Sequence, residues 1–393
     1  MTAKNHYIKR LLETKAESGL KHFQAIALLG PRQCGKSSLA RHLFSKRKNV
    51  IYIDAEKPSD LLKISEPEIF FNHHRNKLIC IDEIQRLPGI FQALRSIIDE
   101  RKTNGQFLLL GSASPELLKQ TSESLAGRIV YYELSPFLLP EVSKKDVKNE
   151  TLMSYWLRGG FPRSFLASDE ATSMQWRKNF IRTFLEKDIP QLGITIPAAA
   201  LHRLWMMCAH HHGQLLNTSQ LGNSLGLSHT TIRNYIELFS QTFVIRTLPP
   251  YYTNTAKRIT KTAKIYIRDS GLLHALLNIE TMNDLLGHPI YGHSWEGMVI
   301  ENIIQSLPDW DAAFYRTATG VEIDLILTKG RKKIAVECKA SSAPEITKGF
   351  WVALEDIKAE EAWIIAPVYE PYPLKKNVMV SSLHHFLQHY SGK

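Results

Sequence analysis

The sequence predicts an α/β protein in which a doubly wound parallel sheet comes first and a smaller α/β domain comes last. Its 393 residues exceed what one hydrophobic core normally covers, so we expect two or three packed domains. Five apolar runs separated by helical stretches fill the first third, and an apolar hairpin pattern occurs in the last third. The content of 44% apolar and 22% charged residues is typical of a globular chain and excludes a disordered one.

The first third predicts five mostly buried strands. Their apolar runs lack alternation and are joined by crossovers of roughly 20 residues, which favours parallel strands with helices on both faces. The runs are FQAIALLG (23–30), NVIYIDA (49–55), KLICID (77–82), QFLLLG (106–111) and RIVYYEL (128–134).

A phosphate-binding loop is expected directly after the first strand. GPRQCGKS has the pattern G-x-x-x-x-G-K-[ST] between a strand and a helix, which is the context that this motif requires. Its glycines let backbone N–H groups wrap a phosphate, Lys36 is expected to meet the β- and γ-phosphates, and Ser37 to ligate Mg²⁺. The alternative is a glycine-rich turn without a ligand. The expected nucleotide contacts are Gly30, Pro31, Arg32, Gln33, Cys34, Gly35, Lys36, Ser37 and Ser38.

Two acidic residues end the third strand, at the sheet edge where open α/β sheets bind ligands. We expect Asp82 to hold Mg²⁺ through water and Glu83 to act as the general base on the attacking water; the alternative is two solvated acids. Ser112 follows the fourth strand and is a candidate for orienting that water, or else a turn residue. Arg128 opens the fifth strand and is a candidate for reaching a γ-phosphate, or else a surface charge.

These motifs, in their order and spacing, resemble the AAA-type P-loop ATPases of bacteria and archaea that carry a C-terminal domain of uncharacterised function. The matching segments are YIKR, GPRQCGKS, LICIDEIQRL, LLLGSAS and LAGRIVYYELSPF, and the resemblance extends over most of the chain. It implies ATP and Mg²⁺ as cofactors, a strand order of 5-1-4-3-2, and the Walker A, Walker B and sensor roles given above. Cys34 and Ser37 stand where Val and Thr are usual. GGFP looks like the family's turn beside the adenine, contacted through Pro162; locally it also fits a helix-ending turn.

The middle of the chain carries the largest positive charge and is the expected site of a polyanion. The formal net charge is +11, divided into +7 for residues 1–150, +9 for 151–268 and −5 for 269–393. Within it, Gly226 separates two helical patterns, and Ser228 is placed to cap the second. That is a helix-turn-helix pattern, and it resembles the winged-helix modules of the same ATPase family.

The second of these helices has one face free of apolar residues. Thr230, Arg233 and Asn234 lie there and are expected to meet a DNA major groove. A basic wing follows, from which phosphate contacts are expected to be salt-dependent. Winged helices also serve as rigid linkers or lids, and the charge also fits an acidic partner surface. The expected wing contacts are Lys257, Arg258, Lys261 and Lys264.

The last third contains the hairpin VEIDLILTKGRKKIAVECKAS. Pairing Thr328 with Lys333 places Leu325 opposite Val336 and Ile323 opposite Cys338 on one apolar face. On the other face, the same register places Asp324 opposite Glu337, with Lys339 two residues further on. Two carboxylates about 5 Å apart repel unless a proton or a cation lies between them, and a divalent metal would serve.

The E…D…E-x-K pattern formed by Glu296, Asp324, Glu337 and Lys339 resembles the PD-(D/E)XK nuclease fold, which is restriction-endonuclease-like. By that resemblance Asp324 and Glu337 would bind Mg²⁺, Lys339 would orient the attacking water and Glu296 would support the site. The local charge of −5 is unfavourable for DNA, and many domains of this fold have lost hydrolysis.

The four cysteines are far apart in sequence, so neither a disulfide framework nor a zinc module is indicated, and a reducing, cytoplasmic location fits best. No apolar run approaches the roughly 20 residues that span a bilayer, so membrane insertion is not expected. The run His210 to His212 cannot converge on one metal, because helical side chains diverge, and is expected to be solvated.

The domain prediction is an ATPase core at 1–145, a helical lid at 146–195, a winged helix at 196–265 and a nuclease-like domain at 266–393. The function predicted is a Mg²⁺-dependent ATPase that works as a nucleotide-driven switch, with DNA as the expected partner of the winged helix. The alternatives are an ATP-regulated DNA endonuclease, and a signalling or scaffold ATPase that binds protein. The sequence leaves the oligomeric state open between a ring and a monomer.

Overall fold

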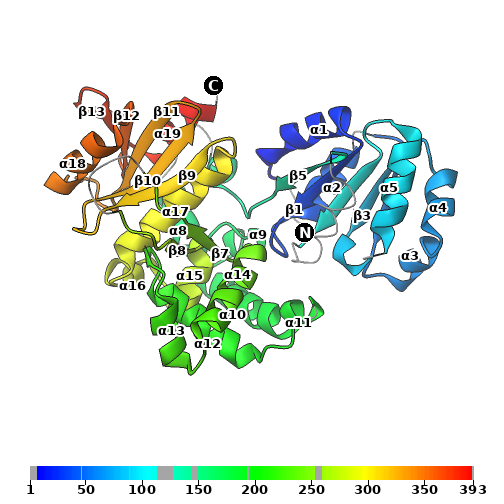
Figure 1. Ribbon diagram of the computed structural model, residues 1–393, viewed down its shortest axis with the longest axis horizontal. Coiled ribbons are helices and arrows are strands. Elements are labelled where there is room, and N and C mark those ends of the chain that lie inside the picture. Colours follow the sequence, from blue (N-terminus) through cyan, green and yellow to red (C-terminus); the bar gives the residue numbers. More distant parts are fainter. Residues whose placement is uncertain are drawn as a thin grey trace. The chain divides into compact units, whose positions relative to one another are not determined.

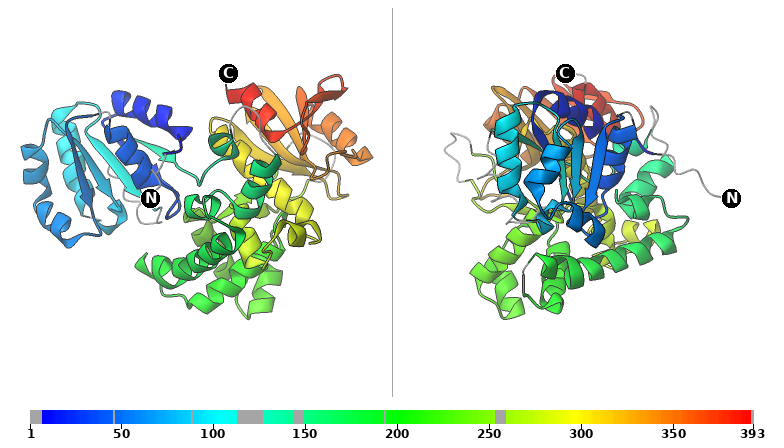
Figure 2. Two further views of the ribbon diagram at one scale, coloured as in Figure 1. Left: turned by 180° about the vertical axis from the view of Figure 1, so that it is seen from behind. Right: turned by 90° about the vertical axis from the view of Figure 1, so that its right-hand side faces the viewer.

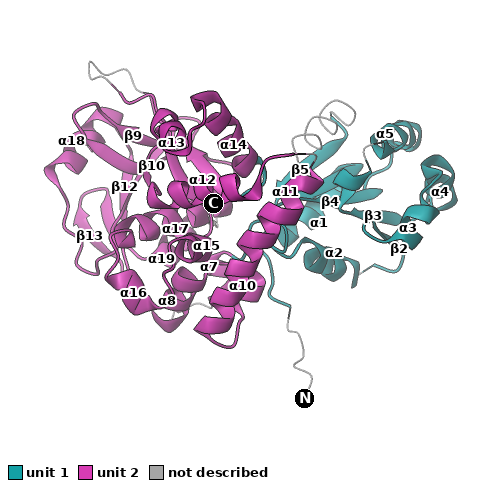
Figure 3. Ribbon diagram, turned by 90° about the horizontal axis from the view of Figure 1, so that it is seen from below, with its two compact units in different colours: residues 1–137, 241–243 teal, residues 138–240, 244–393 magenta. Residues whose placement is uncertain are grey.

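The computed structural model describes residues 7–45, 47–87, 89–112, 127–143, 149–192, 194–252 and 259–391. The chain forms two compact units (Figure 3). Unit 1 comprises residues 1–137 and 241–243, and unit 2 comprises residues 138–240 and 244–393. Each unit has its own hydrophobic core and is described separately below.

Unit 1 is built on a five-stranded sheet in which every paired strand is parallel (Figure 1). Its order, β2-β3-β4-β1-β5, is the order predicted from the family resemblance. Three of the strands are buried along their whole length, which explains why their apolar residues do not alternate. The strands are β1 (Ala25–Leu29), β2 (Val50–Asp54), β3 (Leu78–Asp82), β4 (Phe107–Gly111) and β5 (Ile129–Glu133).

Helices cover both faces of this sheet (Figure 2, right). One face packs against α1 (Leu12–His22) and α2 (Lys36–Ser45), and the other packs against α4 (Pro67–His73) and α5 (Ile90–Arg101). The short helix α3 (Pro58–Lys63) follows β2, and the 3₁₀ turn η1 (Ile84–Arg86) follows β3. The predicted doubly wound domain is therefore confirmed.

Unit 2 begins with helices that share one large core with the rest of the unit. Trp156 and Trp205, both fully buried, lie in this core together with Trp295. Its helical elements are α7 (Leu139–Val142), α8 (Asn149–Arg158), α9 (Pro162–Phe165), α10 (Glu170–Thr183), the π-helical turn η2 (Phe184–Asp188), α11 (Ile189–Gln191), α12 (Ala198–His210), α15 (Ser270–Leu276) and α16 (Met282–Leu286).

The expected helix-turn-helix is formed by α13 (Thr218–Leu225) and α14 (His229–Gln241). Gly226 ends α13 with φ of 67°, and Ser228 Oγ accepts from the N–H of Thr231 at 3.0 Å, as a helix cap does. A Cβ at Gly222 would lie 2.5 Å from the carbonyl oxygen of Leu227, so the tight turn requires glycine there. A three-stranded antiparallel sheet of order β6-β8-β7 accompanies the helices; its strands are β6 (Gln214–Leu215), β7 (Ile245–Leu248) and β8 (Lys264–Ile267).

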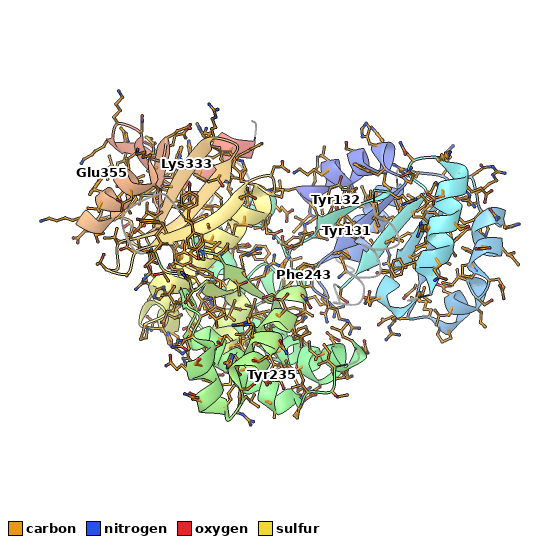
Figure 4. All side chains as sticks on the ribbon, viewed as in Figure 1. Tyr131, Tyr132, Tyr235, Phe243, Lys333 and Glu355 are labelled. Atoms are coloured by element: carbon orange, nitrogen blue, oxygen red, sulfur yellow. The ribbon has the colours of Figure 1, made fainter. Side chains whose placement is uncertain are left out.

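The last part of unit 2 is a six-stranded mixed sheet of order β13-β14-β12-β11-β10-β9. Helices α17 (Tyr291–Ser306) and α19 (Leu383–Ser391) pack on one face, and α18 (Lys348–Ile357) packs on the other. Lys333, labelled in Figure 4, lies on β11 and donates to the carbonyl of Ile357 at the end of α18, at 2.6 Å. The strands are β9 (Asp311–Arg316), β10 (Glu322–Lys329), β11 (Lys332–Cys338), β12 (Glu361–Ile365), β13 (Tyr372–Lys375) and β14 (Val378–Ser381).

The β10–β11 hairpin has the predicted register at its apolar end, with Thr328 opposite Lys333 and Leu325 opposite Val336. The prediction that Ile323 shares the face of Leu325 is wrong. The register against β9 shifts between Ile323 and Ile326, which is the signature of a bulge. Ile323 therefore packs on the α18 side of the sheet, and Leu325 on the α17 side.

The edge strand β9 is covered by the segment that connects β7 to β8. Tyr251 N–H donates to the carbonyl of Phe314 at 2.6 Å, and Thr260 N–H donates to that of Arg316 at 2.9 Å. Bridges join Pro250 to Phe314 and residue 259 to residue 317. The connection expected to form a basic wing is thus attached by its backbone to the C-terminal sheet.

The basic middle and the acidic end of the chain neutralise each other inside unit 2. Glu301 of α17 accepts from Arg246 at 2.6 Å and from Arg268 at 2.6 Å. Burial raises the pKa of Glu301, but the two guanidinium groups outweigh it and lower the pKa to about 2. Lys178 pairs with Glu280 at 2.8 Å. Part of the +9 charge is therefore consumed within the protein. Among the described helices, none is both long and apolar enough to cross a membrane.

Candidate functional site

The loop between β1 and α2 has the backbone of a phosphate-binding turn. Gly35 has φ of 105°, which only glycine adopts readily, and Gln33 is left-handed with φ of 63°. A Cβ at Gly30 would lie 2.1 Å from the carbonyl oxygen of Leu134. Cys34 is fully buried, its thiol donates to the same carbonyl at 3.2 Å, and burial raises its pKa, so it packs rather than reacts.

Lys36 closes this loop on itself. Its Nζ donates to the carbonyls of Gly30 at 2.9 Å and Pro31 at 3.0 Å, and the residue is 5% exposed. These carbonyl contacts hold the ammonium at the mouth of the turn, where the loop N–H groups would bind a phosphate.

Arg10, to which the sequence assigned no role, holds the phosphate loop through hydrogen bonds. Arg10 is 3% exposed, and its guanidinium donates to the carbonyls of Cys34 at 3.0 Å, Ser135 at 2.6 Å and Pro136 at 3.1 Å. It also lies over the ring of Phe137, 5.1 Å from the centroid. Arg10 thus ties the phosphate loop to the segment that follows β5.

The two expected Mg²⁺ ligands lie side by side. Ser37 Oγ donates to Asp82 Oδ2 at 2.7 Å, and Tyr52 Oη on β2 donates to the same carboxylate oxygen. Burial, followed by the hydrogen bond to Asp82, raises the pKa of Tyr52, which therefore stays a donor. A hydroxyl and a carboxylate are oxygen ligands of the kind that Mg²⁺ takes beside a phosphate, so the donor set fits the ion. Tyr52 had no signal in the sequence beyond its place in a strand.

Glu83 and Ser112 are brought together by a third residue, Gln85. The Gln85 amide donates to Glu83 Oε2 and to Ser112 Oγ, the latter at 2.9 Å. Glu83 adopts a left-handed backbone with φ of 53°, a conformation of higher energy for a side chain of this kind that is common at functional sites. The three residues form a polar group at the carboxyl ends of β3 and β4, the sheet edge where the phosphate loop also begins.

Arg128 lies at the amino ends of the strands, opposite the end that carries the phosphate loop. It precedes β5, and its carbonyl accepts from the N–H of Ala25 at the start of β1. Its guanidinium forms a bidentate pair with Asp99, at 2.5 and 3.0 Å. Because the phosphate loop follows the opposite end of β1, Arg128 lies away from the γ-phosphate site of its own chain. Its candidacy as an arginine supplied to a neighbouring subunit stays a prediction.

Contacts within unit 2 account for the GGFP turn. Gly159 ends α8 with φ of 74°, and a Cβ there would lie 2.2 Å from Asp269 Oδ1. The Gly160 N–H donates to Asp269 Oδ2 at 2.8 Å, while Pro162 begins α9. Asp269, which also caps α15, therefore requires glycine at position 159 and a backbone N–H at position 160. The role of Pro162 beside an adenine stays a prediction.

Some of the predicted DNA-contacting residues are exposed, two lie outside the described residues, and one is buried. Thr230, Arg233 and Asn234 are exposed on α14, whereas Ile232 and Phe239 on the opposite side are buried. Lys261 is also exposed. Lys257 and Arg258 lie outside the described residues.

Lys264 is only 2% exposed, so its predicted contact with DNA is wrong. Its Nζ lies 2.8 Å from Glu296 Oε1 and 3.6 Å from Asp324 Oδ1, and it also pairs with Glu322. The predicted nuclease-like residues do converge, but they converge around this ammonium group. His212 is likewise buried rather than solvated, since its ring accepts from the Ile267 N–H at 2.9 Å.

The group formed by Lys264, Glu296, Glu322, Asp324, Glu337 and Lys339 is called the acidic cluster below. Glu296 on α17 also accepts from Tyr266 Oη at 2.6 Å, and Lys339 Nζ donates to Glu337 Oε1 at 2.8 Å. The backbone N–H of Cys338 donates to Asp324 Oδ2 at 2.9 Å. The cluster lies at the floor of a pocket of about 790 Å³, lined also by Gln214, Asn217 and Gln220.

Burial and mutual repulsion govern the charges of this cluster. Burial, and then the charge of Glu337, raise the pKa of Asp324 well above its usual value. Burial lowers the pKa of Lys264, but attraction to Glu296 and the neighbouring acids outweighs it and raises that pKa well above normal. Within the described part of the chain, no three His, Cys, Asp or Glu side chains are arranged to hold a metal ion.

Two mycobacterial proteins are similar to this chain over most of its length. The chain is 38% identical over 371 residues to the uncharacterized protein Rv2008c of Mycobacterium tuberculosis, a match that covers 94% of this chain and 82% of the relative. The uncharacterized protein Mb2031c of Mycobacterium bovis matches to the same extent. The chain belongs to their family.

Three family profiles match this family member in succession. Residues 22–143 match an AAA domain, which covers the phosphate loop, Asp82 and Glu83. Residues 149–283 and 291–386 each match a domain of unknown function, DUF8612 and DUF4143 respectively. The N-terminal part of this family member is thus a P-loop ATPase domain.

Solved structures with some similarity include a Walker-type ATPase, PABY2304 of Pyrococcus abyssi, at 18% identity and a TM-score of 0.49. That match covers 70% of this family member and 97% of the other chain. RuvB of Thermotoga maritima gives 19% identity and a TM-score of 0.30, covering 61% and 86% of the two chains.

Proposed function

We propose that this protein is a Mg²⁺-dependent ATPase that works as a nucleotide-driven switch. The observation that supports this best is the contact of Ser37 with Asp82 at 2.7 Å, beside the polar group of Glu83, Gln85 and Ser112. An AAA domain matches the same residues. Together they supply a metal-ligand pair, a carboxylate and a positioned hydroxyl at the end of a phosphate loop.

Each residue has a defined role in this proposal. Lys36 leaves the carbonyls of Gly30 and Pro31 and binds the β- and γ-phosphates, while Ser37 and Asp82 hold Mg²⁺. The ion, when bound, neutralises phosphate charge. Glu83 accepts the proton of the attacking water, and Ser112 holds that water in line.

Two substitutions test the nucleotide site. Lys36→Ala is expected to lose ATP binding, because it removes the cation at the phosphates. Glu83→Gln is expected to bind ATP but to turn over about 10²–10⁴-fold more slowly, because it lacks the base. The matched controls are Lys9→Ala and Glu100→Gln, which replace exposed residues. ATP binding by calorimetry and phosphate release measure the effects, and unchanged turnover in both variants would contradict the proposal.

DNA is the proposed partner of the α14 face. Thr230, Arg233 and Asn234 are exposed together on a helix that follows a tight turn, and the antiparallel β6-β8-β7 sheet beside it is typical of a winged helix. Because much of the neighbouring basic charge is paired internally, few phosphate contacts and a shallow salt dependence are expected.

Fluorescence anisotropy with duplex DNA at two salt concentrations tests this partner. Arg233→Ala should weaken binding by about 1–3 kcal/mol, whereas the exposed Lys348→Ala on α18 should leave it unchanged. If the protein shows no salt-sensitive affinity for DNA, a protein partner for the same face replaces this proposal. The endonuclease alternative is not favoured, because Lys264 already provides the acidic cluster with a cation.

A further inference from the structure

Lys264 of unit 2 lies among the carboxylates of the acidic cluster, which resembles a nuclease centre. Its Nζ contacts three carboxylates, from α17 and β10, although Lys264 itself belongs to β8. Its ammonium lies 2.8 Å from Glu296 Oε1 and 3.6 Å from Asp324 Oδ1. It therefore lies within the acidic cluster and beside Asp324, one of the two residues to which the nuclease resemblance would assign a divalent ion.

The residues present do not fit a divalent ion while Lys264 stays in place. Mg²⁺ and Mn²⁺ bind carboxylate oxygens at about 2.0–2.2 Å, so an ion on Asp324 Oδ1 would lie within about 6 Å of the Lys264 ammonium. Like charges at that separation repel strongly in a buried site. The Lys339 ammonium, 2.8 Å from Glu337 Oε1, adds a second repulsion.

Lys264 is held in this position by its backbone as well as its side chain. It pairs with Leu215 of β6 on one side and with Leu248 of β7 on the other, at the centre of the three-stranded sheet. The segments that flank β7 and β8 pair in turn with β9, through Tyr251 and Thr260. Lys264 is only 2% exposed, so its ammonium is held among the carboxylates and is not free in solvent.

We propose that Lys264 is the resident cation of the acidic cluster and takes the place of a divalent metal. The Lys264 ammonium supplies the positive charge of the cluster as long as β8 stays packed against the C-terminal sheet. The cluster joins the helix-turn-helix part of unit 2 to its C-terminal sheet, and the C-terminal domain holds no metal in this state.

The charges predict what happens when the ammonium is removed. Four carboxylates, Glu296, Glu322, Asp324 and Glu337, then face Lys339 and Arg316, whose guanidinium donates to Glu322 at 2.6 Å. A buried excess of carboxylates takes up protons, unfolds the site or captures a cation from solution, and a divalent cation in excess at neutral pH competes with the protons. Lys264→Met is therefore expected to create a divalent-cation site where the wild type has none.

The experiment is a titration of the nucleotide-free, full-length protein with Mn²⁺ alone, followed by electron paramagnetic resonance and by thermal unfolding. Lys264→Met should bind Mn²⁺ about tenfold or more tightly than the wild type, because one unit charge within about 6 Å of the ion has been removed. Mn²⁺ should also raise its unfolding midpoint. The matched control is Lys261→Met, an exposed lysine on the same connection, which should behave as the wild type does.

Asp324→Asn locates the added ion. In the Lys264→Met background it should abolish the gained binding, and in the wild-type background it should change nothing. The second comparison needs no Lys264 variant, so it stays decisive if Lys264→Met does not fold. Wild-type protein that binds Mn²⁺ and loses it on Asp324→Asn would overturn the proposal, as would a folded Lys264→Met protein with no gain.

Discussion

Replacing Arg10 by methionine should loosen the phosphate loop and destabilise unit 1. The guanidinium makes three hydrogen bonds to the carbonyls of Cys34, Ser135 and Pro136. A hydrogen bond from a charged donor contributes roughly 1.5–3 kcal/mol, and part of this is offset because the charge no longer has to be buried. The expected net loss is about 3 kcal/mol of unfolding free energy. ATP affinity should fall about tenfold or more, since the Cys34 carbonyl loses its anchor.

The tryptophan distribution allows this loss to be assigned to one unit. All seven tryptophans lie between residues 156 and 363, so tryptophan fluorescence reports on unit 2 only, whereas circular dichroism reports on both units. In urea, Arg10→Met should lower the dichroism midpoint by about 1 M or more and leave the fluorescence midpoint in place. The matched control is Lys9→Met, an adjacent exposed residue of the same charge. Equal midpoints and equal ATP affinities for the two variants would refute the role of Arg10.

Two further predictions concern Arg128 and the buried histidines. Arg128→Ala should leave ATP turnover within about twofold of wild type, since its guanidinium pairs with Asp99 at the end of the strands opposite the phosphate loop; a loss of about 10³-fold or more would instead place Arg128 at a γ-phosphate. Burial lowers the pKa values of His212 and His274 to about 3, whereas in the unfolded chain both bind a proton near pH 6.5, so unit 2 should lose stability as the pH falls below 6.5. Burial raises the pKa of Asp269 to about 6, which opposes this loss, and the net change from pH 7.5 to 5.5 should be about 2 kcal/mol. Urea midpoints followed by tryptophan fluorescence measure it. His274→Gln should reduce the change to about 0.5 kcal/mol, because one histidine is then nearly balanced by Asp269. A midpoint independent of pH in the wild type would contradict the prediction.

The parallel sheet was predictable because its signals are local. A buried strand shows itself as an unbroken apolar run, and a glycine-rich turn between such a run and a helix leaves few alternatives. The position of Arg128 was also predictable from the sequence. Arg128 precedes the fifth strand, whereas the phosphate loop follows the first, and in a parallel sheet these positions lie at opposite ends of the strands.

The surroundings of Lys264 were not predictable, because they depend on contacts between distant parts of the chain. Glu296, Glu322 and Asp324 follow it by 32 to 60 positions, and charge counted along the sequence does not distinguish a buried lysine from an exposed one. The bulge in β10 was hidden for a similar reason. A strictly alternating pattern places Ile323 on the α17 side, and only the pairing with β9 shows the extra residue.

The cover over β9 bears on how the chain can be divided. The family profiles change between residues 283 and 291, which invites the expression of two separate fragments. A cut there would expose the backbone of β9 as an open template for intermolecular strand pairing. It would also remove Arg246 and Arg268 from Glu301 and Lys264 from Glu296. Aggregation of a fragment starting at residue 284 would therefore be a property of the cut and not of the domain.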